Sequence, residues 1–167
     1  MTSANPLQDK VILVVDDEQD IIETIEEELD ICLIHKATNY ETALQYLLSY
    51  TYDFVILDIM GVNGFELLKD SVSRGFPTIM LTAHALSPES LKTSINMGAT
   101  FFLPKEKISD LKLFLEDVVK GGGKPIWQKL FNKLGSYFSN RFGPNWKKDS
   151  STIKTLEEEF KDYLQKH

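Results

Sequence analysis

Five short apolar runs within the first 103 residues constrain the fold of this chain more than any other feature. They are residues 10–15, 32–35, 54–59, 78–81 and 100–103. Most of these runs are continuous rather than alternating, and several are rich in β-branched residues. That pattern is typical of strands buried on both faces of a parallel sheet. The run at residues 32–35 is the weakest of the five.

Segments with apolar residues at helical spacing follow the five runs. The predicted helices are residues 21–29, 39–48, 65–72, 87–98 and 108–118. Asn39 and Ser87 are good N-caps, Pro88 suits the first helical position, and Gly98 suits a helix end. Alternating strands and helices predict an α/β fold, a doubly wound five-stranded parallel sheet with helices on both faces. Ligands of such folds bind outside the carboxyl ends of the strands.

Polar residues suited to phosphoryl chemistry follow four of the predicted strands. Asp16 and Asp17 follow the first, Asp58 lies near the end of the third, Thr82 ends the fourth, and Lys105 follows the fifth. Clustered carboxylates repel one another unless a cation joins them, and carboxylate oxygens suit Mg²⁺. A lysine and a hydroxyl nearby would stabilise a phosphoryl group, and an aspartate can be its nucleophile.

Four stretches, VILVVDDEQDI, DFVILDIM, TIMLTAHA and GATFFLPKE, resemble the response-regulator receiver domain of bacterial two-component signalling. The resemblance extends from Lys10 to about Lys120 and implies a flavodoxin-like receiver fold. It implies that Asp58 is the phosphoacceptor, which takes a phosphoryl group from a phosphohistidine of a histidine kinase or phosphotransfer protein. It also implies that Asp17 binds Mg²⁺ together with Asp58, that Asp16 helps to position the ion, and that the main-chain carbonyl of Met60 is a further ligand.

The resemblance assigns three more residues to phosphoryl binding and switching. Lys105 contacts the phosphoryl oxygens, Thr82 hydrogen-bonds the phosphoryl group, and Phe102 is the aromatic residue that turns inward when Thr82 moves. Phosphorylation then biases a two-state surface formed by the fourth helix, the fifth strand and the fifth helix. We expect the output to be contact with an unidentified downstream protein, or a homodimer through this face or through the C-terminal tail.

The sequence departs from the family pattern in three places. The segment after Asp58, IMGVNGFELL, lacks a proline and reaches its glycine about two residues early. Pro104 precedes Lys105, whereas the family has a proline after the lysine, and residue 102 is Phe, which has no phenolic hydroxyl. His84, two residues past Thr82, is either an exposed loop histidine or a residue that contacts the phosphoryl group and tunes its lifetime.

The 167 residues divide by charge into two predicted units joined by Gly121–Gly123. Residues 1–121, the predicted receiver domain, have nine basic and twenty acidic residues, a balance of −11. Residues 122–167, a predicted helical extension, have nine and five, a balance of +4. Apolar stripes from Trp127 to Phe138 and from Ile153 to Leu164 predict two amphipathic helices separated at Gly143-Pro144. This tail could cover the signalling face, extend it or form a homodimer.

Composition excludes several classes of protein. A single cysteine, Cys32, rules out a disulfide framework and favours a cytoplasmic setting. No apolar run approaches a membrane span, and residues 1–10 do not resemble a signal peptide. The acidic balance of residues 1–121 disfavours nucleic-acid binding there.

Three alternatives to a working receiver remain open. A degenerate receiver would act only as an interaction module, and a regulator could bind DNA through the basic tail. A phosphohydrolase would carry an Asp-x-Asp pattern after the first strand, where this chain has DDEQD. The receiver reading predicts no conventional enzyme, at most one that catalyses its own Mg²⁺-dependent phosphorylation and dephosphorylation.

Overall fold

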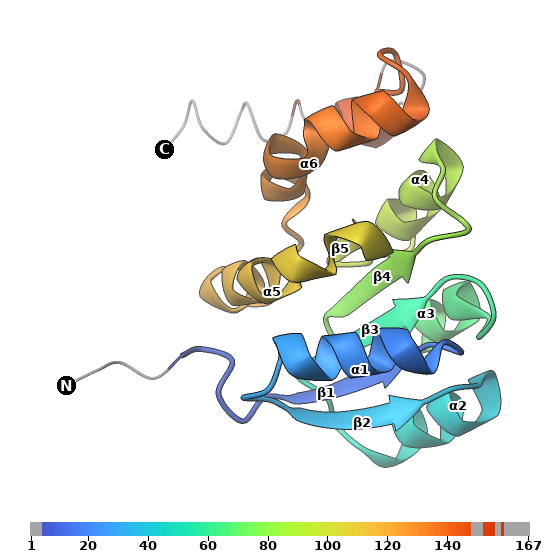
Figure 1. Cartoon of the computed structure of the whole chain (residues 1–167), viewed down its shortest axis with the longest axis vertical. Helices are drawn as coiled ribbons and strands as arrows, with labels where there is room; N and C mark the ends of the chain where they lie inside the picture. Colours follow the sequence, from blue (N-terminus) through green and yellow to red (C-terminus); the bar gives the residue numbers. More distant parts are fainter. Residues whose placement is uncertain (1–4, 148–151, 156–157, 159–167) are drawn as a thin grey trace.

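The computed structural model describes residues 5–147, 152–155 and 158. Five parallel strands form one sheet in the order β2-β1-β3-β4-β5. They are β1 (Val11–Val15), β2 (Leu33–Ala37), β3 (Phe54–Asp58), β4 (Thr78–Thr82) and β5 (Phe101–Pro104). The predicted doubly wound sheet is confirmed (Figure 1). Strand bounds lie within two residues of those predicted, including the weak second strand.

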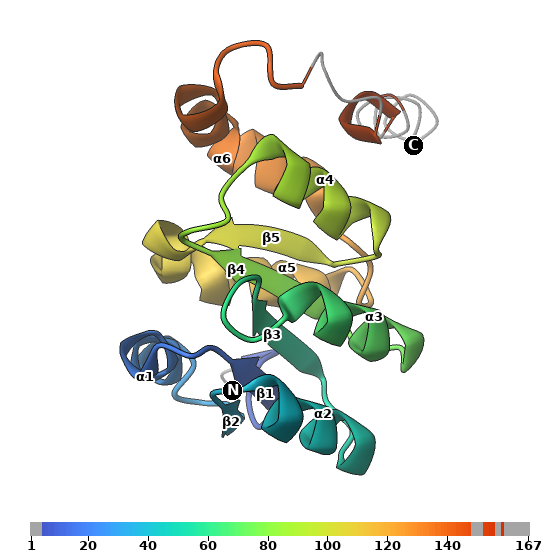
Figure 2. The same cartoon turned by 90° about the vertical axis from the view of Figure 1, so that its right-hand side faces the viewer.

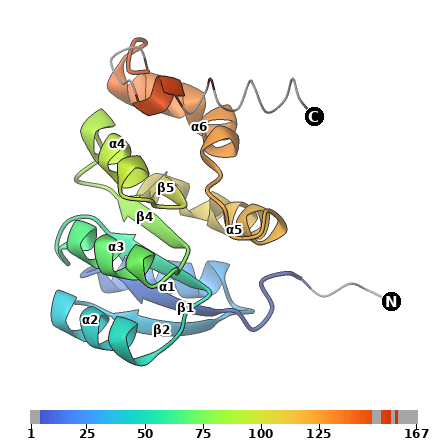
Figure 3. The same cartoon turned by 180° about the vertical axis from the view of Figure 1, so that it is seen from behind.

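Five α-helices cover the two faces of the sheet. They are α1 (Gln19–Glu28), α2 (Tyr40–Ser49), α3 (Gly64–Ser73), α4 (Pro88–Asn96) and α5 (Leu111–Lys120). Helices α1 and α5 lie on one face (Figure 1), and α2, α3 and α4 lie on the other (Figures 2 and 3). The predicted caps form, since the Asn39 side chain accepts a hydrogen bond from the Thr42 amide and Ser87 accepts one from Ser90.

Burial across the sheet explains the differing strength of the sequence signals. Every residue of β3, β4 and β5 is buried, as continuous apolar runs require. Strand β2 lies at an edge of the sheet, and its Leu33 is 54% exposed. Lower burial means that less apolar sequence is needed there, which accounts for the weaker run.

The fifth predicted helix has a different start from the one expected. A short 3₁₀ helix, η1 (Lys105–Asp110), comes first, and α5 begins only at Leu111. Within η1, Lys107 departs from helical geometry, with φ −107° and ψ 20°. Ile108, which the sequence places in the helix, is therefore in η1. This irregular segment follows directly from β5 and carries Lys105 at its first position.

One long helix, α6 (Trp127–Phe142), lies beyond the β5 edge next to α4 and α5 (Figures 1 and 2). It ends at Gly143, as predicted. Its buried residues are those of the predicted apolar stripe, namely Trp127, Leu130, Phe131, Leu134 and Phe138.

The second tail helix is described only in part. Residues 152–155 and 158 are helical and Ile153 is buried, whereas Leu156, Phe160 and Leu164 lie outside the described residues. No helix in the described part of the chain is both long and apolar enough to cross a membrane.

Candidate functional site

The carboxyl ends of β1, β3 and β5 bring predicted site residues into one cluster around Lys105. Its Nζ lies 2.8 Å from Asp16 Oδ2, 3.2 Å from Glu18 Oε1 and 3.4 Å from Asp58 Oδ1. The Lys105 side chain is only 6% exposed, and Asp16 and Asp58 are also buried. A buried ammonium group needs such carboxylate partners, because desolvation of an unpaired charge is costly.

Burial and neighbouring charges shift the proton affinities of this cluster. Burial, followed by the Asp16 charge, raises the pKa of Asp58 from 3.8 to about 7, although Lys105 opposes the shift. Burial also raises the pKa of Asp16. Burial would lower the pKa of Lys105, but the Asp16 and Asp58 carboxylates outweigh it and raise that pKa. When all its carboxylates are ionised, the single positive charge of Lys105 does not balance them, so a further cation would be stabilised in the cluster.

Asp58→Asn should stabilise the metal-free protein above pH 7. Because folding raises the Asp58 pKa from 3.8 to about 7, the native state holds the extra proton between these values. Stability from this group therefore falls as pH rises through that window. Asn removes the penalty, so we expect a gain of about 1–3 kcal/mol at pH 8 and almost none below pH 4. Urea unfolding at both pH values measures it, and an equal gain at both would contradict the assignment.

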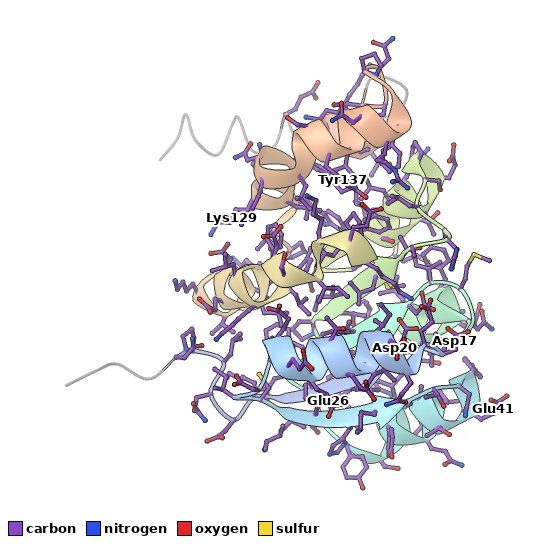
Figure 4. All side chains as sticks on the ribbon, viewed as in Figure 1. Asp17, Asp20, Glu26, Glu41, Lys129 and Tyr137 are labelled. Atoms are coloured by element: carbon purple, nitrogen blue, oxygen red, sulfur yellow. The ribbon has the colours of Figure 1, made fainter. Side chains whose placement is uncertain are left out.

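Carboxylate oxygens at this site fit a hard divalent cation. One oxygen each from Asp16, Asp17 and Glu18 lie within 4.8 Å of one another. Asp17 is exposed at the cluster (Figure 4), and Gly61 approaches it so closely that a Cβ there would lie 2.5 Å from Asp17 Oδ2. An all-oxygen set with open space beside it suits Mg²⁺, which keeps several waters. The residues present therefore fit the predicted magnesium ion.

Gly61→Ala should weaken Mg²⁺ binding about tenfold or more, because the added methyl group displaces the Asp17 carboxylate. Gly75→Ala is a matched control. Gly75 has a similar positive φ, +80° against +86°, but a Cβ there has no atom within 4 Å. Both variants bear the same backbone strain, so only Gly61→Ala should lose affinity in a Mg²⁺ titration. An equal loss of Mg²⁺ affinity in both variants would show that backbone strain, rather than the methyl group added at Gly61, causes it.

Asp58 opens onto a cavity of about 440 Å³. Its lining residues are Asp17, Glu18, Asp58, Met60, Gly61 and His84. Met60 and His84 therefore lie at the cavity, as the sequence interpretation placed them. The use of the Met60 carbonyl as a ligand and of His84 as a modulator both stay predictions.

The shortened loop after Asp58 closes through two backbone features. Asn63 adopts a left-handed conformation with φ 55°. The Gly64 amide donates to the Ile59 carbonyl at 3.0 Å, and a Cβ at Gly64 would collide with the Asp58 carbonyl oxygen. Only glycine allows α3 to start this close to β3. The described peptide bonds are all trans, including that between Lys105 and Glu106.

Two predicted switch residues do not line the cavity. The Thr82 hydroxyl accepts a hydrogen bond from the Ala85 amide at 2.9 Å, and Thr82 is buried at the end of β4. Phe102 is fully buried in β5, with its ring centroid 6.3 Å from that of Phe138 in α6. Their switching roles stay predictions.

Sequence reasoning missed two residues of the site. Glu18 is not among the predicted site residues, although it pairs with Lys105. Gly61 was not singled out, although it contacts Asp17. The close DDE spacing is a signal for Glu18, whereas the contact of Gly61 depends on the path of its loop.

Comparison with known protein families gives a match over most of the sheet-forming part of the chain. The family model described as "Response regulator receiver domain" matches residues 12–116. No curated protein sequence is significantly similar to the chain.

Solved structures of receivers share the fold. A BeF3-activated DrrB receiver domain is 24% identical, covering 65% of this chain and 99% of that one, with a TM-score of 0.56. A CheY-like receiver protein from Methanospirillum hungatei JF-1 is 24% identical over 68% of this chain and 99% of that one, also with a TM-score of 0.56. The response regulator DrrB from Thermotoga maritima is 21% identical over 70% and 55%, with a TM-score of 0.62.

Proposed function

This chain belongs to the response regulator receiver domain family, and on that premise we propose that it accepts a phosphoryl group on Asp58. The donor is a histidine kinase or a phosphotransfer protein. The observation that carries the proposal is the position of Lys105 Nζ, 3.4 Å from Asp58 Oδ1, beside a cavity lined by Asp17 and Asp58. A lysine, a nucleophilic carboxylate and oxygen ligands for a cation are the parts that phosphoryl transfer requires.

The transfer exchanges one bond to phosphorus for another. A carboxylate oxygen of Asp58 forms the new O–P bond while the N–P bond of the phosphohistidine breaks, and the leaving imidazole takes up a proton. Lys105 neutralises charge on the phosphoryl oxygens. Asp16, Asp17 and Asp58, with the Met60 carbonyl, would hold Mg²⁺, and the bound ion would offset negative charge at the carboxylate and the incoming phosphoryl group. Thr82 would hydrogen-bond that group once it is bound.

His84 is the residue that we propose to tune the lifetime of the aspartyl phosphate. It lines the same cavity as Asp58, so its ring can hinder the approach of hydrolytic water. His84→Ala should raise the rate of phosphoryl loss severalfold, because water then reaches the phosphoryl group more easily, without preventing phosphorylation. Time-resolved intact mass after removal of the donor measures this rate. An unchanged half-life would eliminate the role.

The output that we propose is a protein–protein contact. Residues 1–121 would form the receiver and residues 122–167 a helical extension that belongs to its signalling face. The alternative is a degenerate receiver that binds partners without taking phosphate. The shortened loop after Asp58 favours the degenerate form, but the Lys105 cluster and the oxygen donors beside it favour phosphorylation.

Acetyl phosphate distinguishes the two proposals. Its O–P bond breaks to release acetate, and the purified protein should gain the mass of one phosphoryl group when Mg²⁺ is present. Chelation of Mg²⁺ should prevent the gain. If acetyl phosphate and a panel of phosphorylated histidine phosphotransfer proteins all fail to add the group, the degenerate receiver is the better description.

A further inference from the structure

Helix η1 connects the cluster around Lys105, which includes Asp58, with helix α6. Lys105, its first residue, inserts Nζ among the carboxylates of the cluster. The next residue, Glu106, forms an ion pair of 3.2 Å with Arg141 of α6. Adjacent residues of one irregular segment thus contact the proposed phosphorylation site and the C-terminal helix. A movement of η1 therefore changes the contacts at both places.

A basic and aromatic stripe on α6 faces η1 and α5. Its members are spaced by four residues, which places them on one side of the helix: Lys129, Lys133, Tyr137 and Arg141. Figure 4 shows Tyr137 on the side of α6 that faces η1. The stripe contacts η1 and α5 through Lys129–Asp117 at 3.5 Å, Lys133–Asp110 at 3.4 Å and Lys107 over the Tyr137 ring at 5.1 Å.

Charge makes α6 complementary to the surface beneath it. The helix has three basic residues and no acidic one, whereas its ion-pair partners are all acidic residues of a receiver with a balance of −11. Partly exposed pairs of this kind contribute little each and are readily broken. The apolar side of α6 adds Phe138 against Phe102 of β5, the strand that leads directly into Lys105.

Resting on the proposed function, we propose that α6 is a reversible cover on the face formed by β5, η1 and α5, and that phosphorylation of Asp58 weakens its docking. A phosphoryl group brings a charge of about −1.5 to −2. Lys105, now shared among Asp16, Glu18 and Asp58, is drawn toward that charge. Because Lys105 begins η1, its displacement moves Glu106 and Lys107 away from the positions that match Arg141 and Tyr137. Release uncovers both the acidic face and the basic, aromatic side of α6 for a protein partner.

Hydrogen exchange of the full chain tests this coupling. After treatment with acetyl phosphate and Mg²⁺, amides of α6 should exchange about 5- to 150-fold faster, the range of typical coupling between two sites. Amides of α2, which has no contact with η1 or α6 among the interactions described, should be unchanged. Intact mass of the same sample reports the phosphoryl group. Phosphorylated protein with unchanged or slower α6 exchange would overturn the coupling and leave the proposed function intact.

Lys105→Met tests the same link without phosphate. It removes the ammonium group that ties η1 to the cluster, so α6 should exchange at least about fivefold faster in the unmodified protein. Lys36→Met is the control, since Lys36 lies in β2 at the opposite edge of the sheet from α6 and, among the described residues, forms an ion pair with Glu26 alone. Faster α6 exchange in Lys105→Met alone supports the coupling even if acetyl phosphate fails to modify the chain. Equal exchange in the two variants refutes it.

A charge exchange separates the Glu106–Arg141 pair from general loosening. Arg141→Glu places two acids together and should speed exchange of α6. Glu106→Arg in that background restores an opposite-charge pair and should slow exchange again. Failure of the second change to reverse the first would show that this pair does not hold α6 to η1.

Discussion

Asp58→Asn should abolish the gain of a phosphoryl group from acetyl phosphate, with a loss of at least about 10³-fold in rate. The amide has no negative charge, and its carbonyl oxygen is a much weaker nucleophile than a carboxylate oxygen, while its similar shape keeps the cavity intact. Asp20→Asn is the matched control, because Asp20 lies in the first turn of α1 and does not line the cavity. Intact mass and peptide mapping measure the modified fraction.

The pH dependence of the same reaction checks the role of Asp58. Only the ionised carboxylate attacks phosphorus, and burial raises its pKa to about 7 in the absence of metal. The rate at low Mg²⁺ should therefore rise about tenfold per pH unit below this value and level off above it. Saturating Mg²⁺ should move the midpoint to lower pH, because the cation favours the ionised form. A phosphoryl group retained in Asp58→Asn would assign the acceptor to another residue.

Phe138→Ala should lower the free energy of unfolding of the α6 layer, meaning α6 together with the residues that follow it as far as Trp146, by about 3–5 kcal/mol. That is the usual cost of emptying a fully buried Phe site. Phe138 is fully buried, and its ring lies 6.3 Å from Phe102, 5.5 Å from Phe142 and 5.6 Å from Trp146, measured between centroids. These neighbours belong to both β5 and the α6 segment, so the lost contacts are those that hold the two together.

The protein's own tryptophans report this loss. The chain has two, Trp127 and Trp146, and both are buried in the α6 layer. Urea unfolding followed by their fluorescence should have a lower midpoint in Phe138→Ala. Leu113→Ala, at a 53% exposed position of α5, should shift it by less than about 0.5 kcal/mol. Equal midpoints for wild type and Phe138→Ala would contradict the packing described.

Much of the sheet and of the site is predictable because buried parallel strands leave a simple signal. Continuous apolar runs locate the strands, and the rule that ligands bind at their carboxyl ends selects Asp16, Asp58 and Lys105 before any coordinates are known. The structure brings these three side chains together.

The remaining features depend on contacts between segments distant in the sequence. Glu18 and Lys105 form an ion pair although they are far apart in the sequence. The pair can therefore be recognised only once the fold places the Lys105 side chain beside Glu18. The approach of Gly64 to the Asp58 carbonyl depends on how a short loop closes. The apolar stripe of α6 predicts that the helix packs on another surface. Only the contact of Phe138 with Phe102 shows that this surface lies at β5.

The position of α6 also determines how copies of this domain can associate through their sheets. With α6 lying alongside β5 (Figure 1), strand β2 is left as the accessible edge of the described sheet. Its Leu33 side chain is exposed. Two copies that paired β2 with β2 would be related by a twofold axis, and the pairing would use up the edge in both. Strand addition then stops at a dimer, whereas a sheet with two bare edges can grow without limit into a fibre. With α6 alongside the β5 edge, strand addition between copies would have only the β2 edge to use.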